Sequence, residues 1–355
     1  MVPAMRLPPP DTARVDEVLS RYREPVLAAM RQALDRQGVE HVWLMRYHLG
    51  WEDAAGAAIA AADGGGKMLR PSLCLLACEA AGGDARRALA AAAALELVHN
   101  FTLIHDDIED ASATRHGRET LWRVVGVPQA INAGDGMFVI AQRTLLRMAE
   151  AGVEPGRVLD ASRALNEACV ALCEGQHADL GFEARPSVTL AEYEAMIAGK
   201  TASLLGAAAA IGGIAAGGDA ATVAALGECG RRLGMAFQIQ DDVLGIWGEA
   251  DITGKPVADD IRSRKKSFPV VYAREHLDAD ARSRLERLYA TDAADGAHVD
   301  EVLELLERSG ARAAATGAAA TWARSGIDAA REIALDAEKR GDIEALASFF
   351  VHRSA

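Results

Sequence analysis

The chain has 355 residues, with 38 Lys and Arg against 51 Asp and Glu, and a formal net charge of −13. Half of its residues are hydrophobic, which is too many for an intrinsically disordered chain. The negative charge argues against a protein that binds nucleic acid or anionic membranes, because such proteins need a basic face. An anionic substrate would therefore have to be held by a local basic cluster or by metal ions.

The N-terminal segment and the long remainder differ in composition. Residues 1–12 contain Pro8, Pro9 and Pro10 and no apolar stretch of the signal-peptide kind, so we expect a flexible leader. Residues 13–355 favour one large all-α domain, because Ala, Leu, Glu and Arg dominate and alternating strand-type runs are scarce. Residues 88–97 and 204–216 are apolar around most of a helix circumference, which indicates central helices buried by an outer shell.

Apolar runs and cysteines bear on the cellular context. Residues 204–216 form the longest uniform apolar run, which is broken by glycines and shorter than the roughly 20 residues that span a bilayer, so we expect no membrane span. Cys169, Cys173 and His177 share one helical stripe, so a zinc site is conceivable. The five cysteines include no Cys-x-x-Cys pair, and reduced, buried thiols in a cytoplasmic protein are the favoured interpretation.

Two acidic motifs each end an apolar helix. The first is His105-Asp-Asp-Ile-Glu-Asp110, in which Asp106 and Asp110 are four residues apart and share a face, with Cβ atoms about 6 Å apart. Unpaired like charges at that spacing suggest a bound cation such as Mg²⁺, although a solvated acidic helix end has the same pattern. The second motif places Asp241 and Asp242 about 130 residues later, again after an apolar helix. Together the two motifs could face each other across a cavity.

Basic residues accompany both motifs. Lys67 and Arg70 lie on a glycine-rich turn at a predicted helix start, where backbone amides suit an anion. Arg115, His116 and Arg118 follow the first acidic motif, and Lys255, Lys265 and Lys266 follow the second. Lys200 and Thr201 open the Ala-rich helix. Acids at two helix ends with cations in the adjoining loops suit two diphosphates, one bridged by Mg²⁺ and one held directly by Lys and Arg.

In this arrangement the sequence resembles the trans-isoprenyl diphosphate synthase (polyprenyl synthetase) family. The resemblance rests on six segments in family order: GGKMLRP, LVHNFTLIHDDIEDASATRHGRET, GQHADL, GKTASLLG, FQIQDDVLG and GKPVADDIRSRKKSFP. It implies an all-α fold of about a dozen helices around a central cavity, usually in a homodimer. It also implies about three Mg²⁺ ions, with isopentenyl diphosphate and an allylic diphosphate as substrates.

The resemblance also assigns roles to residues. The implied metal residues are Asp106 and Asp110 with Asp107 in support, and Asp241 with Asp242 beside it; Gln176 and Asp179 lie near the metals. Arg115, Lys200 and Lys255 would hold the allylic diphosphate, and Thr201 and Gln238 would lie near the reacting carbons. Lys67, Arg70 and His99 match the isopentenyl diphosphate site, and Lys265 matches a late basic residue.

Three positions depart from the family pattern. Gly245 stands where many members have the last Asp of the second motif, Met68 replaces a common Arg, and His116 stands where many have a second Arg for isopentenyl diphosphate. We expect metal binding to survive, because Asp241 is the expected direct ligand. Arg118 is the candidate to take over the role of the missing arginine, and the affinity for isopentenyl diphosphate is the property that these departures affect.

Product length should depend on the residues that precede the first motif. Phe101 lies about 7.5 Å along the helix from Asp106, at a rise of 1.5 Å per residue, and Thr102 beside it is small. Val98 lies further along. An aromatic residue at this position beside a small one resembles 20-carbon, geranylgeranyl diphosphate synthases; a 15-carbon, farnesyl product is the alternative. Phe101 as an ordinary core residue is the simpler interpretation.

Two other function classes remain open. A terpene cyclase of related fold would use the same Mg²⁺ trigger, but it has no use for a second diphosphate site at Lys67, Arg70 and His99. A non-catalytic partner subunit is a second possibility, since Gly245 and His116 depart from the pattern, but the first acidic motif is intact. The expected reaction is head-to-tail prenyl transfer by ionisation of the allylic diphosphate.

Overall fold

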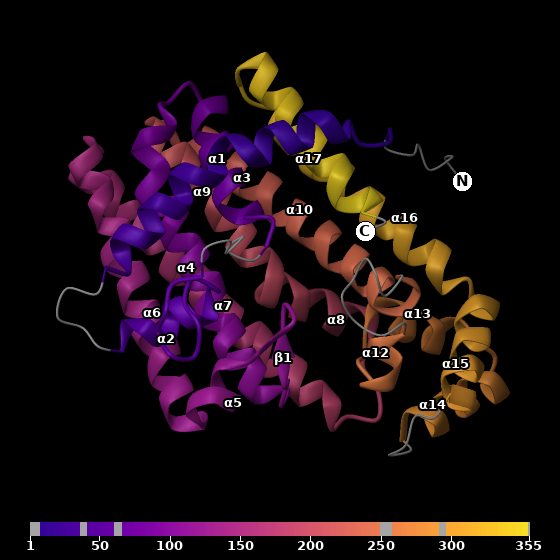
Figure 1. The fold of residues 1–355 in the computed structure, drawn as a ribbon. Coiled ribbons are helices and arrows are strands. Elements are labelled where there is room, and N and C mark those ends of the chain that lie inside the picture. Colours follow the sequence, from indigo (N-terminus) through magenta and orange to yellow (C-terminus); the bar gives the residue numbers. More distant parts are fainter. Residues whose placement is uncertain (1–7, 36–40, 60–65, 249–257, 291–295, 354–355) are drawn as a thin grey trace.

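The computed structural model describes residues 8–35, 41–59, 66–248, 258–290 and 296–353 (Figure 1). Helices make up almost all of the described regular structure, which confirms the expected all-α class. In the first half they are α1 (Thr12–Ala33), α2 (Val42–His48), α3 (Leu69–Ala80), α4 (Ala85–Glu109), α5 (Leu121–Val125), α6 (Val127–Leu146), the 3₁₀ helix η1 (Arg147–Ala151) and α7 (Pro155–Glu183). In the second half they are α8 (Leu190–Ile197), the π-helical turn η2 (Ala198–Ala202), α9 (Ser203–Ala216), α10 (Ala220–Trp247), α12 (Asp259–Arg262), α13 (Phe268–His276), α14 (Ala279–Ala290), α15 (Gly296–Ser309), α16 (Ala311–Arg331) and α17 (Ala337–His352).

The centre of the fold is formed by α4, α9 and α10. Helix α9 packs against α3, α7 and α10, and α4 packs against α3 and α6. Small residues allow this close packing: a Cβ atom added to Gly212 of α9 would lie 2.2 Å from the carbonyl oxygen of Cys74 on α3. The two Ala-rich segments lie in these central helices and are largely buried, as predicted.

The N-terminal segment is held at its inner end. Helix α1 begins at Thr12, and the Asp11 side chain caps it by accepting a hydrogen bond from the N–H of Arg14. The carbonyl of Pro8 accepts a hydrogen bond of 3.0 Å from Ser348 Oγ on α17. The predicted leader is therefore docked from Pro8 onwards, and residues 1–7 lie outside the described residues.

A β-hairpin that the sequence did not reveal follows the first acidic motif. Strands β1 (Thr114–Arg115) and β2 (Arg118–Glu119) pair antiparallel, with His116 and Gly117 between them. Both turn residues have positive φ, 50° and 72°, as a type I′ turn requires. The hairpin places Arg115 and His116 beside the end of α4.

Two helical stretches are long and apolar enough to span a membrane by length and composition, Ala85–Glu109 and Leu190–Ala216. In each, 72% of the apolar window is buried inside the protein, as in the core helices of globular domains. The second extends the predicted run 204–216 backwards through η2 and α8.

Candidate active site

The two acids of the first motif have different surroundings. Burial raises the pKa of the Asp106 carboxyl to about 7; Lys200 lowers it, and Asp110 and Glu109 raise it further. Asp107 is buried and accepts hydrogen bonds of 3.0 and 2.8 Å from Nε and Nη2 of Arg115. Asp106 is thus a desolvated acid whose ionised form a bound cation would stabilise. Asp107 is already paired with the guanidinium of Arg115.

The same division occurs in the second motif. The Asp241 side chain is 52% exposed, and that of Asp242 is 1% exposed. Asp242 accepts hydrogen bonds from four donors, the Tyr193 hydroxyl, the backbone N–H of Phe268, Gln238 Nε2 and Lys265 Nζ, at 2.5–3.2 Å. Asp107 and Asp242 are therefore buried among protein donors in this structure, which favours supporting roles for them. The accessible side chain of Asp241 and the desolvated Asp106, with Asp110 one turn further on, are the better candidates for metal ligands.

Residues of η2 and α7 connect the two acidic motifs. Lys200 Nζ lies 2.5 Å from Asp179 Oδ2 and is close enough to Asp106 to lower the pKa of that carboxyl. Burial alone would lower the pKa of Lys265. The nearby carboxylates of Asp242, Asp260 and Asp241 raise it, and Asp179 adds a smaller contribution in the same direction. A single network of alternating charges therefore links the acids of α4 to those of α10.

The π-helical turn brings two predicted residues of the reaction centre together. Thr201 Oγ1 donates a hydrogen bond of 2.7 Å to Gln238 Oε1 on α10. The turn crosses α7 so closely that a Cβ at Gly175 would lie 2.1 Å from the backbone nitrogen of Lys200. Single π turns inside helices are often found at functional sites, and here the turn carries both Lys200 and Thr201.

Arg70, in the first turn of α3, lies near acids of both α4 and α10, and Lys67 lies just before this helix. Met68 caps α3 in the left-handed conformation, with φ of 48°, and its side chain is buried. Position 68, where an Arg is common in the family, is therefore not a surface position in this fold. Burial lowers the pKa of Arg70, whereas Glu96 on α4 and Asp241 on α10 raise it. The Arg70 Nε atom is buried and has no hydrogen-bond partner within the described structure. Lys67 Nζ lies 4.7 Å from the ring centroid of Phe349.

The histidines near this basic group are held neutral. Burial lowers the pKa of His99 well below its ordinary value, and Arg70 and Arg115 lower it further. Partial burial and Arg115 also lower the pKa of His116. Arg118 is not available to replace a second arginine at His116, because its Nη1 and Nη2 donate to the carbonyls of Tyr47 and Glu52.

Arg353, near the C-terminus, belongs to this site and was missed by the sequence interpretation. Its Nη2 lies 3.2 Å from Asp241 Oδ1, and its guanidinium lies 4.0 Å from the ring centroid of Phe237. Burial lowers the pKa of Lys67, and the charge of Arg353 lowers it further. No sequence signal distinguishes this arginine from others, because it lies 112 residues from Asp241.

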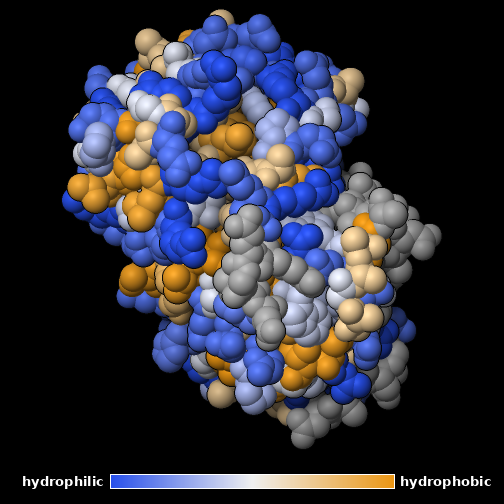
Figure 2. Space-filling view, turned by 60° about the vertical axis from the view of Figure 1, so that its left-hand side comes forward, coloured by the Kyte–Doolittle hydropathy of each residue, from blue (hydrophilic) through white to orange (hydrophobic). Residues whose placement is uncertain are grey.

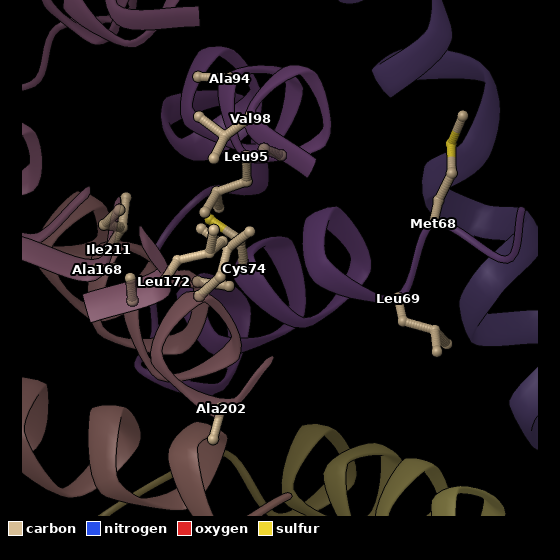
Figure 3. Packing of buried hydrophobic residues seen from close by; sticks show 14 of the residues in the cluster. Met68, Leu69, Cys74, Ala94, Leu95, Val98, Ala168, Leu172, Ala202 and Ile211 are labelled. Atoms are coloured by element: carbon tan, nitrogen blue, oxygen red, sulfur yellow. The ribbon is translucent and has the colours of Figure 1, made fainter. Parts of the chain in front are cut away.

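The predicted chain-length residues lie along α4. The Phe101 ring packs edge-on against Phe138 of α6, with 5.1 Å between centroids, and against His105 at 5.8 Å. The Thr102 hydroxyl donates to the carbonyl of His99, so its methyl group is the part left for packing. Figure 3 shows Val98 with Ala94 and Leu95 on the part of α4 that faces other apolar side chains. Phe138 was not identified from the sequence.

The donor set fits Mg²⁺ better than a transition metal. No group of three His, Cys, Asp or Glu that could hold an ion was found among the residues that the structure describes, so the conceivable zinc site at Cys169, Cys173 and His177 gains no support. Magnesium commonly takes one or two carboxylates and completes its shell with water and substrate phosphate, which suits acids spread over α4 and α10. Gln176, which donates to Glu109 at 2.6 Å, lies beside these acids. Lys255 lies outside the described residues.

Comparison with known proteins gives consistent matches over most of the chain. The family model described as polyprenyl synthetase matches residues 54–306. The (2E,6E)-farnesyl diphosphate synthase of Mycobacterium tuberculosis is 38% identical over 357 residues, covering 98% of each chain. The geranylgeranyl diphosphate synthase of the same organism is 42% identical over 277 residues, covering 78% of this chain and 77% of that protein. The crystal structure of polyprenyl synthetase from Streptomyces coelicolor A3(2) superposes with a TM-score of 0.87 at 36% identity, over 95% of this chain and 99% of that one.

Proposed function

Because this chain belongs to the polyprenyl synthetase family, we propose that it joins isopentenyl diphosphate head to tail to an allylic diphosphate in a Mg²⁺-dependent reaction. The observation that carries the proposal is the charge network that links Asp106, Lys200 and Asp179 to Lys265 and Asp241. Such a network is suited to an anion that is bound between two acidic helix ends.

The proposed allylic site combines acids, cations and a polar pair. Asp106, Asp110 and Asp241 would hold the metal ions, and bound Mg²⁺ would neutralise the leaving diphosphate as the allylic C–O bond breaks. Lys200 would contact the diphosphate, and Arg115, whose guanidinium is oriented by its paired hydrogen bonds to Asp107, would do the same. The hydrogen-bonded oxygens of Thr201 and Gln238 would face the developing carbocation.

The proposed isopentenyl site lies at the start of α3. Lys67 and Arg70 would bind the second diphosphate directly, and the buried, unpaired Nε of Arg70 is a donor that such a ligand could satisfy. Neutral His99 can donate a hydrogen bond without adding charge. The isopentenyl double bond then attacks the allylic carbon, and the proton that is lost passes to the departing diphosphate.

We further propose a 20-carbon product. Phe101 and Phe138 together form an aromatic wall about 7.5 Å along α4 from Asp106, which would limit the growing chain there. Farnesyl diphosphate remains the alternative, because the two mycobacterial relatives carry names that differ in this respect.

The homodimer and the cytoplasmic location are also proposals. Large apolar side chains are exposed on α6 and α7, including Val139 at 57%, Leu159 at 64% and Val170 at 61%. Leu159 and Val170 are 11 residues apart and therefore lie within about 20° on one side of α7. Figure 2 shows separate apolar patches on a largely hydrophilic face. A second copy of the chain would cover the exposed apolar side chains of α6 and α7.

All five cysteines are free thiols, which is the state that a reducing compartment such as the cytoplasm maintains.

The experiment that tests the function is a product assay. The protein is incubated with isopentenyl diphosphate, Mg²⁺ and one of dimethylallyl, geranyl or farnesyl diphosphate, and the products are separated by chain length. A cyclase would release hydrocarbon without consuming isopentenyl diphosphate, and a non-catalytic subunit would give no product.

Variants of the two acidic motifs test the mechanism. We expect Asp106→Ala and Asp241→Ala to lower kcat by at least about 100-fold in excess Mg²⁺, because each removes charge from the metal site. Asp135→Ala is the matched control, since Asp135 is exposed on α6 and lies 3.9 Å from His105 Nε2. Unchanged turnover in either motif variant would exclude the scheme.

A further inference from the structure

The β-hairpin after the first acidic motif carries two arginines directly opposite each other. Arg115 of β1 and Arg118 of β2 are register partners on either side of the turn at His116 and Gly117. Like charges in directly opposed positions destabilise an antiparallel pair, so each needs a partner of its own. Arg115 donates to the Asp107 carboxylate of α4 at 2.8–3.0 Å. The partners of Arg118 lie on the opposite side of the hairpin chain, on α2 and the loop that follows it.

Arg118 and Tyr47 form a reciprocal contact between β2 and α2. Arg118 Nη1 donates a hydrogen bond of 2.8 Å to the carbonyl of Tyr47, and its Nη2 donates one of 2.9 Å to the carbonyl of Glu52. The guanidinium lies over the Tyr47 ring, 4.4 Å from the centroid, and the Tyr47 hydroxyl donates 2.9 Å to the carbonyl of Glu119. We call this set of contacts the Arg118–Tyr47 clamp. A planar guanidinium can serve two carbonyls and a ring face at once, which a lysine ammonium cannot.

The acceptor side of the clamp is held in place by contacts of its own. The Glu52 side chain is buried and accepts a hydrogen bond of 2.6 Å from Arg46 Nε. Gly50, in the turn after α2, has a φ of 74°, and a Cβ atom there would lie only 3.1 Å from Arg118 Nη1. The turn after α2 therefore has the shape that lets the Arg118 guanidinium approach closely, which an arginine used only for solubility does not need.

Helix α2 also lies against the turn of the hairpin. His48 follows Tyr47, and burial together with the charges of Arg115 and His116 lowers its pKa to about 3. His48 and His116 in turn contribute to the lowered pKa of His99 on α4, after burial and the two arginines. The end of α2 is therefore close to both histidines of the candidate isopentenyl diphosphate site.

We propose that Arg118 is a positioning residue which, through the clamp on Tyr47, holds the turn with His116 at the isopentenyl diphosphate site and does not itself bind a diphosphate. Arg115 is held separately by Asp107, so the clamp fixes the second strand and the turn more than the first strand. The kinetic consequence rests on the proposed prenyltransferase function, but the anchoring of the hairpin to α2 does not.

Kinetics of variants on both sides of the clamp test the proposal. We expect Arg118→Ala and Tyr47→Leu each to raise KM for isopentenyl diphosphate about tenfold, with kcat at saturation within about threefold of the parent. KM for the allylic diphosphate should stay within about threefold, because Arg115 keeps its hydrogen bonds to Asp107. A loss of stability alone would lower the active fraction, and hence kcat, without this rise in KM. The double variant should be no worse than about twofold beyond either single variant, since both remove the same clamp, and independent, multiplying effects would overturn the proposal.

Conservative variants separate positioning from direct binding. Arg118→Lys keeps the charge but loses the second carbonyl and the stacking, so its KM should match that of Arg118→Ala within about threefold. An Arg118→Lys variant with the parent's KM, or a folded Tyr47→Leu variant with the parent's KM, would show direct binding and overturn the proposal. Tyr47→Phe keeps the ring, loses only the hydrogen bond to Glu119 and should raise KM about two- to threefold. Arg123→Ala is the matched control, because Arg123 is an exposed arginine of α5 that lies over Trp122, and its KM should stay within about twofold.

Amide hydrogen exchange in the substrate-free, metal-free protein makes the result independent of activity. The N–H of Thr120 donates 3.1 Å to the carbonyl of Ala113 and closes the base of the hairpin. Exchange in residues 111–120 should be at least about tenfold faster in Arg118→Ala and Tyr47→Leu than in the parent, and unchanged in Arg123→Ala. Equal exchange in the parent and the clamp variants would overturn the proposal. If the parent protein forms no prenyl diphosphate, the proposed function fails, and the exchange comparison still decides whether Arg118 anchors the hairpin.

Discussion

Truncating Phe101 should lengthen the product by about one isoprene unit. On α4 the rise of 1.5 Å per residue places Phe101 about 7.5 Å, Val98 about 12 Å and Ala94 about 18 Å from Asp106. Phe101→Ala therefore moves the first large obstacle on this side of α4 by about 4.5 Å, close to the length of one extended unit. Phe138 stays in place in this variant, so a 25-carbon chain is the expected limit.

The product assay with farnesyl diphosphate as starter reads this shift directly. Removing Phe138 as well should allow longer chains, because its ring packs edge-on against Phe101. Phe101 is only partly buried, so Phe101→Ala should cost at most about 3 kcal/mol of folding stability, and each variant needs a Tm measurement. Leu103→Ala is the control, since Leu103 lies about 200° around the helix from Phe101 and should leave product length unchanged. An unaltered product from both folded Phe variants would show that the chain does not end at this wall.

The remaining predictions concern protonation, the isopentenyl site and assembly. Burial raises the pKa of Asp106 to about 7, well above the value of about 4 in an unfolded chain, so the metal-free fold binds an extra proton and loses stability as pH rises through that interval. Asp106→Asn should remove this loss, and its Tm advantage over the parent in EDTA should grow from pH 5 to pH 8; a constant difference would contradict the shift. His116→Arg should lower KM for isopentenyl diphosphate severalfold at pH 8, where the histidine is neutral, and an unchanged KM would exclude that position from the site. Val139→Asp combined with Leu159→Asp should convert a dimer to monomers in analytical ultracentrifugation, whereas an unchanged sedimentation coefficient would place the interface elsewhere.

Helical class and the central helices could be predicted because they depend on composition and local periodicity. The Ala-rich segments of α4 and α9 are apolar on all sides, and a helix of this kind is stable only where other helices surround it. The acidic motifs were equally visible, since unpaired carboxylates at i, i+4 are unfavourable unless something compensates them. What the pattern could not reveal is which acid of each pair meets protein donors. For Asp242 two of the four donors come from α8 and α13, and only the tertiary fold brings them to α10.

The features that the sequence did not reveal have weak local signals. A π turn such as η2 uses the same residue types as an α-helix, and here it accompanies the close crossing of α7 at Gly175. The left-handed conformation of Met68 is rare for a residue other than Gly, Asn or Asp, so the sequence gives no reason to expect it. Arg353 reaches Asp241 only because α17 packs against α10, which no short motif encodes.

Gly245 shows why a motif position is better judged by the volume around it than by the residue that stands there. Taken alone, the glycine removes an acid from the second motif and suggests weaker metal binding. In the fold, that space is filled by the Asp260 carboxylate, less than 3 Å from where a Cβ would be. A side chain at 245 would therefore require the Asp260 carboxylate to move from its present position. Asp242 and Asp260 still lie beside Lys265, although position 245 carries no acid.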